Sequence, residues 1–343
     1  YIQSHPSAKL LFLAFAFLTA ISCWSTGMHA LLDIFAGVAV YAAVYKREYL
    51  WSRILYAAEQ IANSWKEWRF GSVRLINHGL YAGCAAAIGF LIVGFITDDS
   101  MFWASVVIGI SIILGAGLWG QRVVGSQKLL RPFGYYGAVL GAAAGTLFAH
   151  LVFDQDVLPL AAALSVAAPW IQAVGRLRCL VQGCCHGSET SNGLGIHYRH
   201  QRSRVLQIAG LGGKALYPTP VFSMASNFLI GLVSMRLLLV GAPATFIIGV
   251  YLMLNGLARF VEEAYRGEPQ TQVFAGLKVY QWTALSSFVT GTVFTMLPSV
   301  AVGTQHFGFT PMVWVGSVAM GVFVTIAMGV DWPEANRRFS RLI

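Results

Sequence analysis

Two short segments combine arginines with other reactive side chains, and each follows directly on a long apolar run. Residues 175–187 read GRLRCLVQGCCHG, and residues 259–269 read RFVEEAYRGEP. Ionisable groups at a membrane boundary are costly to place and are a mark of function. A guanidinium group holds a phosphate through two parallel hydrogen bonds, and two such groups stabilise charge on a departing phosphate. We therefore expect the two segments to meet over a phospholipid head group.

Individual side chains in these segments suggest separate roles. Arg176, Arg178 and Arg259 can grip a phosphodiester. Glu263 lies one helical turn after Arg259, where it could orient that guanidinium group or act as a general base. The alternative is that these arginines only anchor helix ends at the membrane interface.

The elements that position these residues are predicted to be membrane-spanning helices. The 343 residues are 57% hydrophobic and 11% charged, whereas a soluble domain carries about 25% charged residues. Apolar runs near the length needed to cross a bilayer recur at about 9–24, 31–45, 75–96, 102–120, 133–153, 157–175, 217–235, 244–263, 279–298 and 312–330. We predict an all-α polytopic integral membrane protein with about ten transmembrane helices, whose Gly- and Ala-rich stretch at 137–145 allows close helix packing.

The basic residues are expected to serve the membrane rather than nucleic acid. The net charge is +9, and in a polytopic protein Lys and Arg gather in cytoplasmic loops and near anionic head groups. Residues 46–74 are rich in Lys, Arg and Trp, which suits an interfacial linker between residues 1–45 and a membrane domain at 75–343. The positive-inside rule places both ends and the 176–214 loop in the cytoplasm.

A possible catalytic pair lies in the N-terminal region. On a helix beginning near His29, Asp33 follows one turn later and could raise the basicity of the imidazole. The alternative is an ordinary helix entry with an acidic first turn. With Ser22, these residues resemble the third motif of the type-2 phosphatidic acid phosphatase superfamily, although Cys23 stands at its arginine position. The resemblance covers about residues 1–45, and we expect it to be the C-terminal part of a longer phosphatase-like domain.

A series of motifs between residues 70 and 298 has a stronger resemblance. In chain order they are NHGLY at 77–81, FGYYGA at 133–138, the 175–187 segment, YPTP at 217–220, NGLARF at 255–260, RGEP at 266–269 and YQW at 280–282. This ordered set is similar to the prolipoprotein diacylglyceryl transferase family. The resemblance implies a multi-pass protein of the bacterial inner membrane that moves the diacylglyceryl group of phosphatidylglycerol onto the lipobox cysteine of a prolipoprotein. The products are a thioether and glycerol phosphate, and no cofactor is expected.

The resemblance also implies roles for particular residues. By position, the catalytic set is Arg176, Arg259, Glu263 and Tyr136. The substrate-binding set is Arg178, Gln182, His186, Arg266 and Tyr217.

This chain departs from the family pattern at the site. Arg178, Cys179, Gln182 and Cys184 stand where the signature has Gly, Asn, Asn and Glu, and Tyr136 stands where many members have His. A family-like mechanism would then need Tyr136, His186 or Glu263 to help deprotonate the acceptor thiol. The alternatives are a lipid-modifying transferase with another acceptor, or a non-catalytic phospholipid-binding or transport protein.

The cysteines raise the question of a metal site. Thiolates and imidazole suit zinc, and Cys179, Cys184, Cys185 and His186 lie close together in the sequence. Because two of these cysteines are adjacent and no second Cys-x-x-Cys pair exists, the spacing fits zinc poorly. We expect no metal ion.

Overall fold

The computed structural model describes residues 14–19, 21–22, 31–97, 99–122, 133–191, 193–267, 273–302 and 308–331. The chain divides into two compact units, residues 1–56 and 57–343. The first unit holds α2 (Leu31–Tyr45) and most of α3 (Arg47–Ala62). At 15 residues, α2 is shorter than the roughly 20 needed to cross a bilayer.

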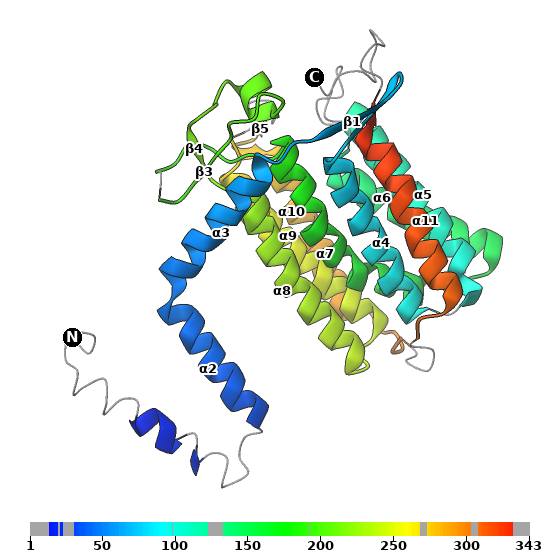
Figure 1. The fold of residues 1–343 in the computed structure, drawn as a ribbon. Coiled ribbons are helices and arrows are strands. Elements are labelled where there is room, and N and C mark those ends of the chain that lie inside the picture. The colour runs from blue at the N-terminus through cyan, green and yellow to red at the C-terminus, as the bar shows by residue number, and fades with distance from the viewer. Residues whose placement is uncertain are drawn as a thin grey trace. The chain divides into compact units, whose positions relative to one another are not determined.

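The second unit is a bundle of long helices (Figure 1). These are α4 (His78–Ile96), α5 (Phe102–Arg122), α6 (Tyr135–Phe153), α7 (Val157–Gln182), α8 (Thr219–Leu239), α9 (Ala244–Ala264), α10 (Val279–Met296) and α11 (Pro311–Gly329), with a 3₁₀ turn, η1 (Asp99–Met101). Seven of the described helices are long and apolar enough to cross a membrane, α10 not among them. The predicted all-α polytopic class is confirmed, but the predicted number of about ten spans is larger than these criteria give for the described residues.

The short strands lie together at one end of this bundle (Figure 1). Strands β1 (Glu67–Phe70), β2 (Val73–Ile76) and β7 (Val330–Asp331) form an antiparallel sheet in that order, with Leu75 opposite Val330. The two other pairs are β3 (Ile196–His197) with β4 (Ala215–Leu216), and β5 (Val273–Phe274) with β6 (Leu277–Lys278). A π-helical segment, η2 (Val205–Ala209), lies between β3 and β4. The region 46–74 thus contains α3 and the β1–β2 hairpin, and its role as an interfacial linker stays a prediction.

Small residues bring the helices close, as the sequence predicts for residues 137–145. A side chain at Gly141 would meet the backbone of Ser111 on α5, and one at Gly145 would lie 2.8 Å from Ser111 Cβ. The same device joins α9 to α10, where a side chain at Gly249 would come within 2.6 Å of the Gly291 oxygen. In lipid, where apolar burial adds little, such backbone proximity is what holds helices together.

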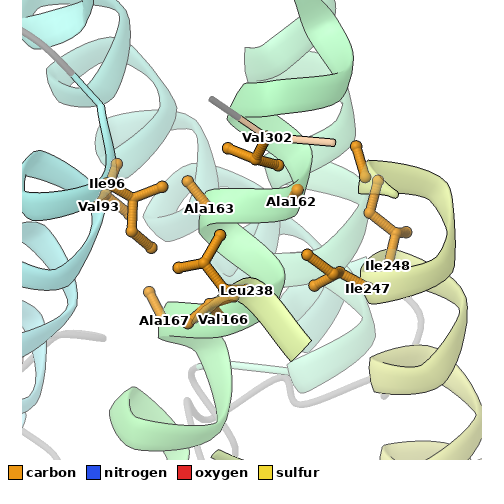
Figure 2. Close-up of a cluster of buried hydrophobic side chains, with 11 residues drawn as sticks. Val93, Ile96, Ala162, Ala163, Val166, Ala167, Leu238, Ile247, Ile248 and Val302 are labelled. Atoms are coloured by element: carbon orange, nitrogen blue, oxygen red, sulfur yellow. The ribbon is translucent and has the colours of Figure 1, made fainter. Parts of the chain in front are cut away.

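One buried cluster ties α7 to its neighbours (Figure 2). It comprises Val93, Ile96, Ala162, Ala163, Val166, Ala167, Leu238, Ala244, Ile247, Ile248 and Val302. Three alanines and Val166 come from the N-terminal half of α7, and the others come from α4, α8, α9 and the segment before α11. This half of α7 is therefore packed against three helices of the unit.

Candidate functional site

The C-terminal end of α7 supplies the first half of the site. The predicted span 157–175 was too short, because nothing breaks the helix until Gly183, so α7 extends to residue 182. Gly183 has a φ of 67° and donates its N–H to the Cys179 oxygen at 2.9 Å, a left-handed cap that glycine adopts without steric cost. The turn brings Cys185 back toward α7, where its Sγ lies 3.5 Å from Nη1 of Arg176.

The end of α9 supplies the second half as a compact set of ion pairs. Arg259 Nη1 lies 3.0 Å from Glu262 Oε1, and Arg259 Nη2 lies 3.2 Å from Glu263 Oε2. Arg266 Nη2 lies 2.8 Å from Glu262 Oε1, and Arg266 Nε lies 3.5 Å from Glu263 Oε2. All four residues are at most 7% exposed. Spacings of three and four residues put these groups on one helix face.

The structure brings the two charged segments together. Gly187 and Arg266 form an antiparallel backbone bridge, and Arg176 Nη2 lies 3.6 Å from Glu262 Oε2. Lys278 fixes the end of α9 from the side of α10, donating to the backbone oxygens of Glu263 at 2.7 Å and Arg266 at 2.8 Å. Lys278, the last residue of β6 and the one before α10, thereby holds the end of the arginine set in place.

A small cavity of about 120 Å³ lies where the segments meet. It is lined by Phe133, Gly134, Tyr135, Arg176, Arg178, Cys179, Gln182, Cys184, Cys185, Arg204, Arg259, Arg266 and Tyr280. We call it the arginine pocket. The Arg259 guanidinium carbon lies 5.3 Å from the centre of the Tyr280 ring, within cation–π range.

One arginine of the pocket, Arg178, differs from the others in its partners. Five arginines line the pocket, and among the described residues the neighbouring carboxylates of Glu262 and Glu263 pair with Arg176, Arg259 and Arg266. Burial lowers the pKa of Arg204 to about 10, so this side chain is still charged at neutral pH. Arg178 is 9% exposed, its Nε has no hydrogen-bond partner, and no described residue forms an ion pair with it. A buried cation without a partner calls for an anion.

A second cavity, of about 320 Å³, adjoins the arginine pocket. Its walls are apolar side chains of α4, α5, α6, α7 and α11, among them Ala85, Phe90, Ile113 and Met320. Arg176 and Arg178 line both cavities, as do four other residues. An apolar space that ends at guanidinium groups matches an amphiphile with an anionic head.

A chain of hydrogen bonds on the side of α8 orients Arg176. The Nε of Arg176 donates to Ser223 Oγ at 2.8 Å, and the backbone oxygen of Ser223 accepts from the side-chain amide of Asn227. The amide of Asn255 donates to Asn227 and to Gln172. Gln172 donates to the Tyr251 hydroxyl, which is hydrogen-bonded to the hydroxyl of Tyr135 at the pocket wall. Buried polar networks of this kind fix side-chain geometry.

The other predicted site residues lie near the pocket but differ in their contacts. Gln182 lines the pocket, is fully buried, and has no hydrogen-bond partner for its amide among the described residues. Tyr136 stacks on Tyr280 with ring centres 5.9 Å apart and lies behind the wall. His186 Nδ1 is 3.0 Å from the Gly187 oxygen.

Tyr217 also lies outside the pocket lining. Its ring packs on the ring of Tyr265, with the ring centres 5.2 Å apart, and its backbone oxygen accepts a hydrogen bond from the Gly187 N–H at 3.1 Å. It therefore supports the loop that carries the cysteines.

The phosphatase-like residues belong to the other unit. Ser22 is an exposed residue in a short helical stretch, and Asp33 belongs to α2. His29 lies outside the described residues. The proposed arrangement of these three residues stays a prediction.

Sequence reasoning assigned no role to Glu262, which proves to be the carboxylate that joins the two segments. Glu262 follows Arg259 by three residues and precedes Arg266 by four, and these spacings predict its ion pairs with both arginines. No pattern in the sequence points to its third partner, Arg176, or to the help that Arg176 receives from Ser223.

The three cysteines form a compact group whose sulfur atoms all lie within 4.8 Å of one another. Such a group could hold a soft metal ion on geometry alone. The arginines that line the same pocket oppose a cation there by direct repulsion, and the absence of a metal ion stays a prediction.

This architecture is that of a polytopic membrane protein in which an apolar cavity ends at a pocket lined by arginines. The family profile described as prolipoprotein diacylglyceryl transferase matches residues 132–297, a range that contains α6 to α10 and all of the arginine pocket. The chain belongs to the prolipoprotein diacylglyceryl transferase family and is a transferase.

Two curated relatives agree with this assignment. The chain is 30% identical over 186 residues to phosphatidylglycerol–prolipoprotein diacylglyceryl transferase 2 of Clostridium perfringens, a match that covers 51% of this chain and 70% of the relative. It is 23% identical over 203 residues to the phosphatidylglycerol–prolipoprotein diacylglyceryl transferase of Clostridium tetani, covering 57% of this chain and 79% of the relative.

Proposed function

We propose that this protein transfers the diacylglyceryl group of phosphatidylglycerol to the lipobox cysteine of a prolipoprotein in the bacterial inner membrane. The observation that carries the proposal is the position of Arg178. This guanidinium group is buried, without an ion pair to any described residue, at the junction of an apolar cavity and a cationic pocket. A phosphodiester with two acyl chains would supply the missing charge on one side and fill apolar space on the other.

The arginines would contact the phosphate from two positions in the site. Arg176 and Arg178 line both cavities, and the diester would sit at their junction, whereas Arg259 and Arg266 line the arginine pocket and not the apolar cavity. The acceptor sulfur would attack the carbon of the diacylglyceryl group that is bonded to the phosphate oxygen. The carbon–oxygen bond then breaks, and glycerol phosphate leaves with the electron pair. Fixed guanidinium groups stabilise the charge that grows on the departing phosphate.

Glu263 is proposed to act through the arginines it holds. Its carboxylate is fully buried and pairs with Arg259 and Arg266. Tyr136, behind the pocket wall, would position Tyr280 against Arg259. The resemblance of residues 1–45 to the phosphatidic acid phosphatase superfamily remains a separate prediction.

The test is a transfer assay with purified protein in phosphatidylglycerol vesicles and a lipobox peptide. The expected result is a peptide that gains one diacylglyceryl group, with release of glycerol phosphate and loss of both in Arg176→Ala. The matched control is Arg199→Ala, because Arg199 is 72% exposed. Release of glycerol phosphate without peptide modification would indicate another acceptor. Lipid binding without any turnover would contradict the proposal and favour a non-catalytic lipid-binding protein.

A further inference from the structure

The arginine pocket offers few groups that can accept a proton. Its described lining residues include no carboxylate and no imidazole. Glu262 and Glu263 are engaged by arginines, and His186 lies outside the lining. The remaining titratable acids in the lining are the phenols of two tyrosines and the thiols of three cysteines. Of these, only a thiol ionises near neutral pH.

Cys185 has the surroundings that stabilise a thiolate. Its Sγ lies 3.5 Å from Arg176 Nη1 and 3.8 Å from Cys184 Sγ, and Cys179 Sγ lies within 4.8 Å. The contacts of its sulfur with those of Cys179 and Cys184, together with the charges of the nearby Arg266 and Arg176, hold the pKa of Cys185 well below its usual value, although burial opposes this. The pKa of Cys184 is raised by its contacts with the other two thiols and by burial.

The other groups around the thiols are mostly cationic or neutral. Arg204 faces the cysteines from the segment before η2, and so does the Tyr198 hydroxyl, which is buried without a hydrogen-bond partner. Glu262 approaches from α9 but is neutralised by its arginines. An anion on Cys185 is therefore favoured by the charges of the neighbouring arginines.

We propose that the Cys185 thiolate takes the proton from the acceptor thiol during diacylglyceryl transfer. The inference rests on the proposed function. In this step the acceptor S–H bond breaks, the proton moves to Cys185 Sγ, and the acceptor thiolate attacks the glycerol carbon. The carbon–oxygen bond breaks, and the departing glycerol phosphate dianion receives the proton from Cys185. The base is thereby regenerated as a thiolate, with no oxidant or cofactor consumed.

The chemistry suits a thiol base. A general base works best when its pKa lies near the working pH, because it is then largely deprotonated and still accepts a proton readily. The acceptor is itself a cysteine thiol, with an ordinary pKa of about 8.5. A thiolate stabilised by Arg176 can also stay beside the phosphate without displacing it, because the pocket carries more arginines than its two neighbouring carboxylates can neutralise.

The first experiment measures turnover against pH for wild type, Cys185→Ser and Cys185→Ala in phosphatidylglycerol vesicles with the lipobox peptide. The control is Cys84→Ser, an exposed cysteine on α4. We expect both Cys185 variants to lose about 100-fold in kcat at neutral pH while still binding phosphatidylglycerol. Their remaining rate should rise with pH until the acceptor thiol ionises by itself, at about pH 8.5.

A second measurement is independent of turnover. The rate at which iodoacetamide alkylates Cys185 is followed by peptide mass, from about pH 5 to pH 9, with a free cysteine-containing peptide in the same tube as the reference. Cys185 should react as a thiolate at a pH where the thiol of the free peptide does not.

The outcomes separate the two proposals. If wild type transfers and the Cys185 variants match its rate and pH profile, only the role of Cys185 is overturned. If a diacylglyceryl group appears on Cys185 itself, this residue is an acceptor and not the base. If wild type transfers nothing to the peptide, the proposed function fails and the role of Cys185 fails with it, whatever its alkylation profile.

Discussion

Glu262 on α9 lies between Arg176 and Arg266, with Oε2 3.6 Å from Nη2 of Arg176 and Oε1 2.8 Å from Nη2 of Arg266. One carboxylate thus joins α7 to the end of α9 at the pocket. The geometry of both arginines depends on a side chain that does not line the pocket.

Replacing Glu262 with glutamine should disturb both stability and transfer. The amide keeps the size of the side chain but leaves its arginines without their counter-charge, and breaking a buried ion pair costs about 3–5 kcal/mol. We expect a lower unfolding temperature in detergent and a fall in kcat/KM. Glu189→Gln is the control, since Glu189 forms an exposed pair with Lys214 worth about 0–1 kcal/mol. Equal effects of the two substitutions would contradict this role of Glu262.

Arg178→Met should separate binding from stability. Because Arg178 has no ion pair with a described residue, its removal relieves a buried charge instead of breaking a contact. The unfolding temperature should be no lower than that of wild type, while phosphatidylglycerol binding weakens about tenfold or more. Titration with labelled lipid and thermal unfolding in detergent measure the two effects. A loss of stability with unchanged lipid binding would show that Arg178 has a structural role.

The turn after α7 should not tolerate a side chain. Gly183 and Gly210 have nearly equal positive φ values, 67° and 66°, but only at Gly183 would a Cβ meet neighbours, namely Ser203 and Val205. Alanine at either site costs about 1–2 kcal/mol of backbone strain. Gly183→Ala should lose additional stability and most transfer activity, because the turn positions Cys185. Gly210→Ala should keep its activity, and a matching loss there would refute the assignment.

Filling the apolar cavity should act on the acyl chains of the lipid. Ala85 on α4 is 3% exposed and lines this cavity. Ala85→Phe should therefore lower turnover with long-chain phosphatidylglycerol about tenfold, while a short-chain analogue is affected less. Leu114→Phe is the control, because Leu114 on α5 is 61% exposed. An equal loss for both chain lengths would mean that this cavity does not hold the acyl chains.

Acid should weaken the β1–β2 hairpin through Glu67. Burial opposes ionisation of Glu67, but a hydrogen bond from Trp65 and the charges of Arg74 and Arg202 outweigh it, so the pKa lies below the ordinary 4.5. A lowered carboxyl pKa gives stability that is fully present above pH 4.5 and is lost as the pH falls through the folded-state pKa. Glu67→Gln should be less stable than wild type at neutral pH, and the difference should vanish in acid. Unfolding temperatures measured across this range test the prediction.

The membrane class and the place of the site follow from one-dimensional patterns. Arg176 and Arg259 were predictable because an arginine at the end of an apolar run is expensive and rare. The meeting of their segments is confirmed by the backbone bridge between Gly187 and Arg266. Close packing at 137–145 was predictable for a similar reason, since only small side chains permit it.

The contacts that each residue makes inside the site could not be predicted from the sequence. Glu262 and Glu263 follow Arg259 at three and four residues, and both spacings suit a pair on a helix. Which carboxylate also reaches α7 depends on the rotation of α9 in the bundle, a tertiary property. For the same reason the pattern could not tell that Tyr135 lines the pocket and Tyr136 lies behind it.

The hydrogen bonds from Lys278 to the end of α9 have a consequence for biosynthesis. The two backbone oxygens that it holds belong to Glu263 and Arg266, so the arginine set is complete only after α10 has joined α9. A nascent chain that has emerged as far as α8 already carries Arg176, its partner Ser223 and the thiols, but it lacks Glu262, Arg259 and Arg266. Ribosome-bound intermediates would therefore be inert toward the surrounding lipid, and chemistry would begin only once the late helices have been inserted.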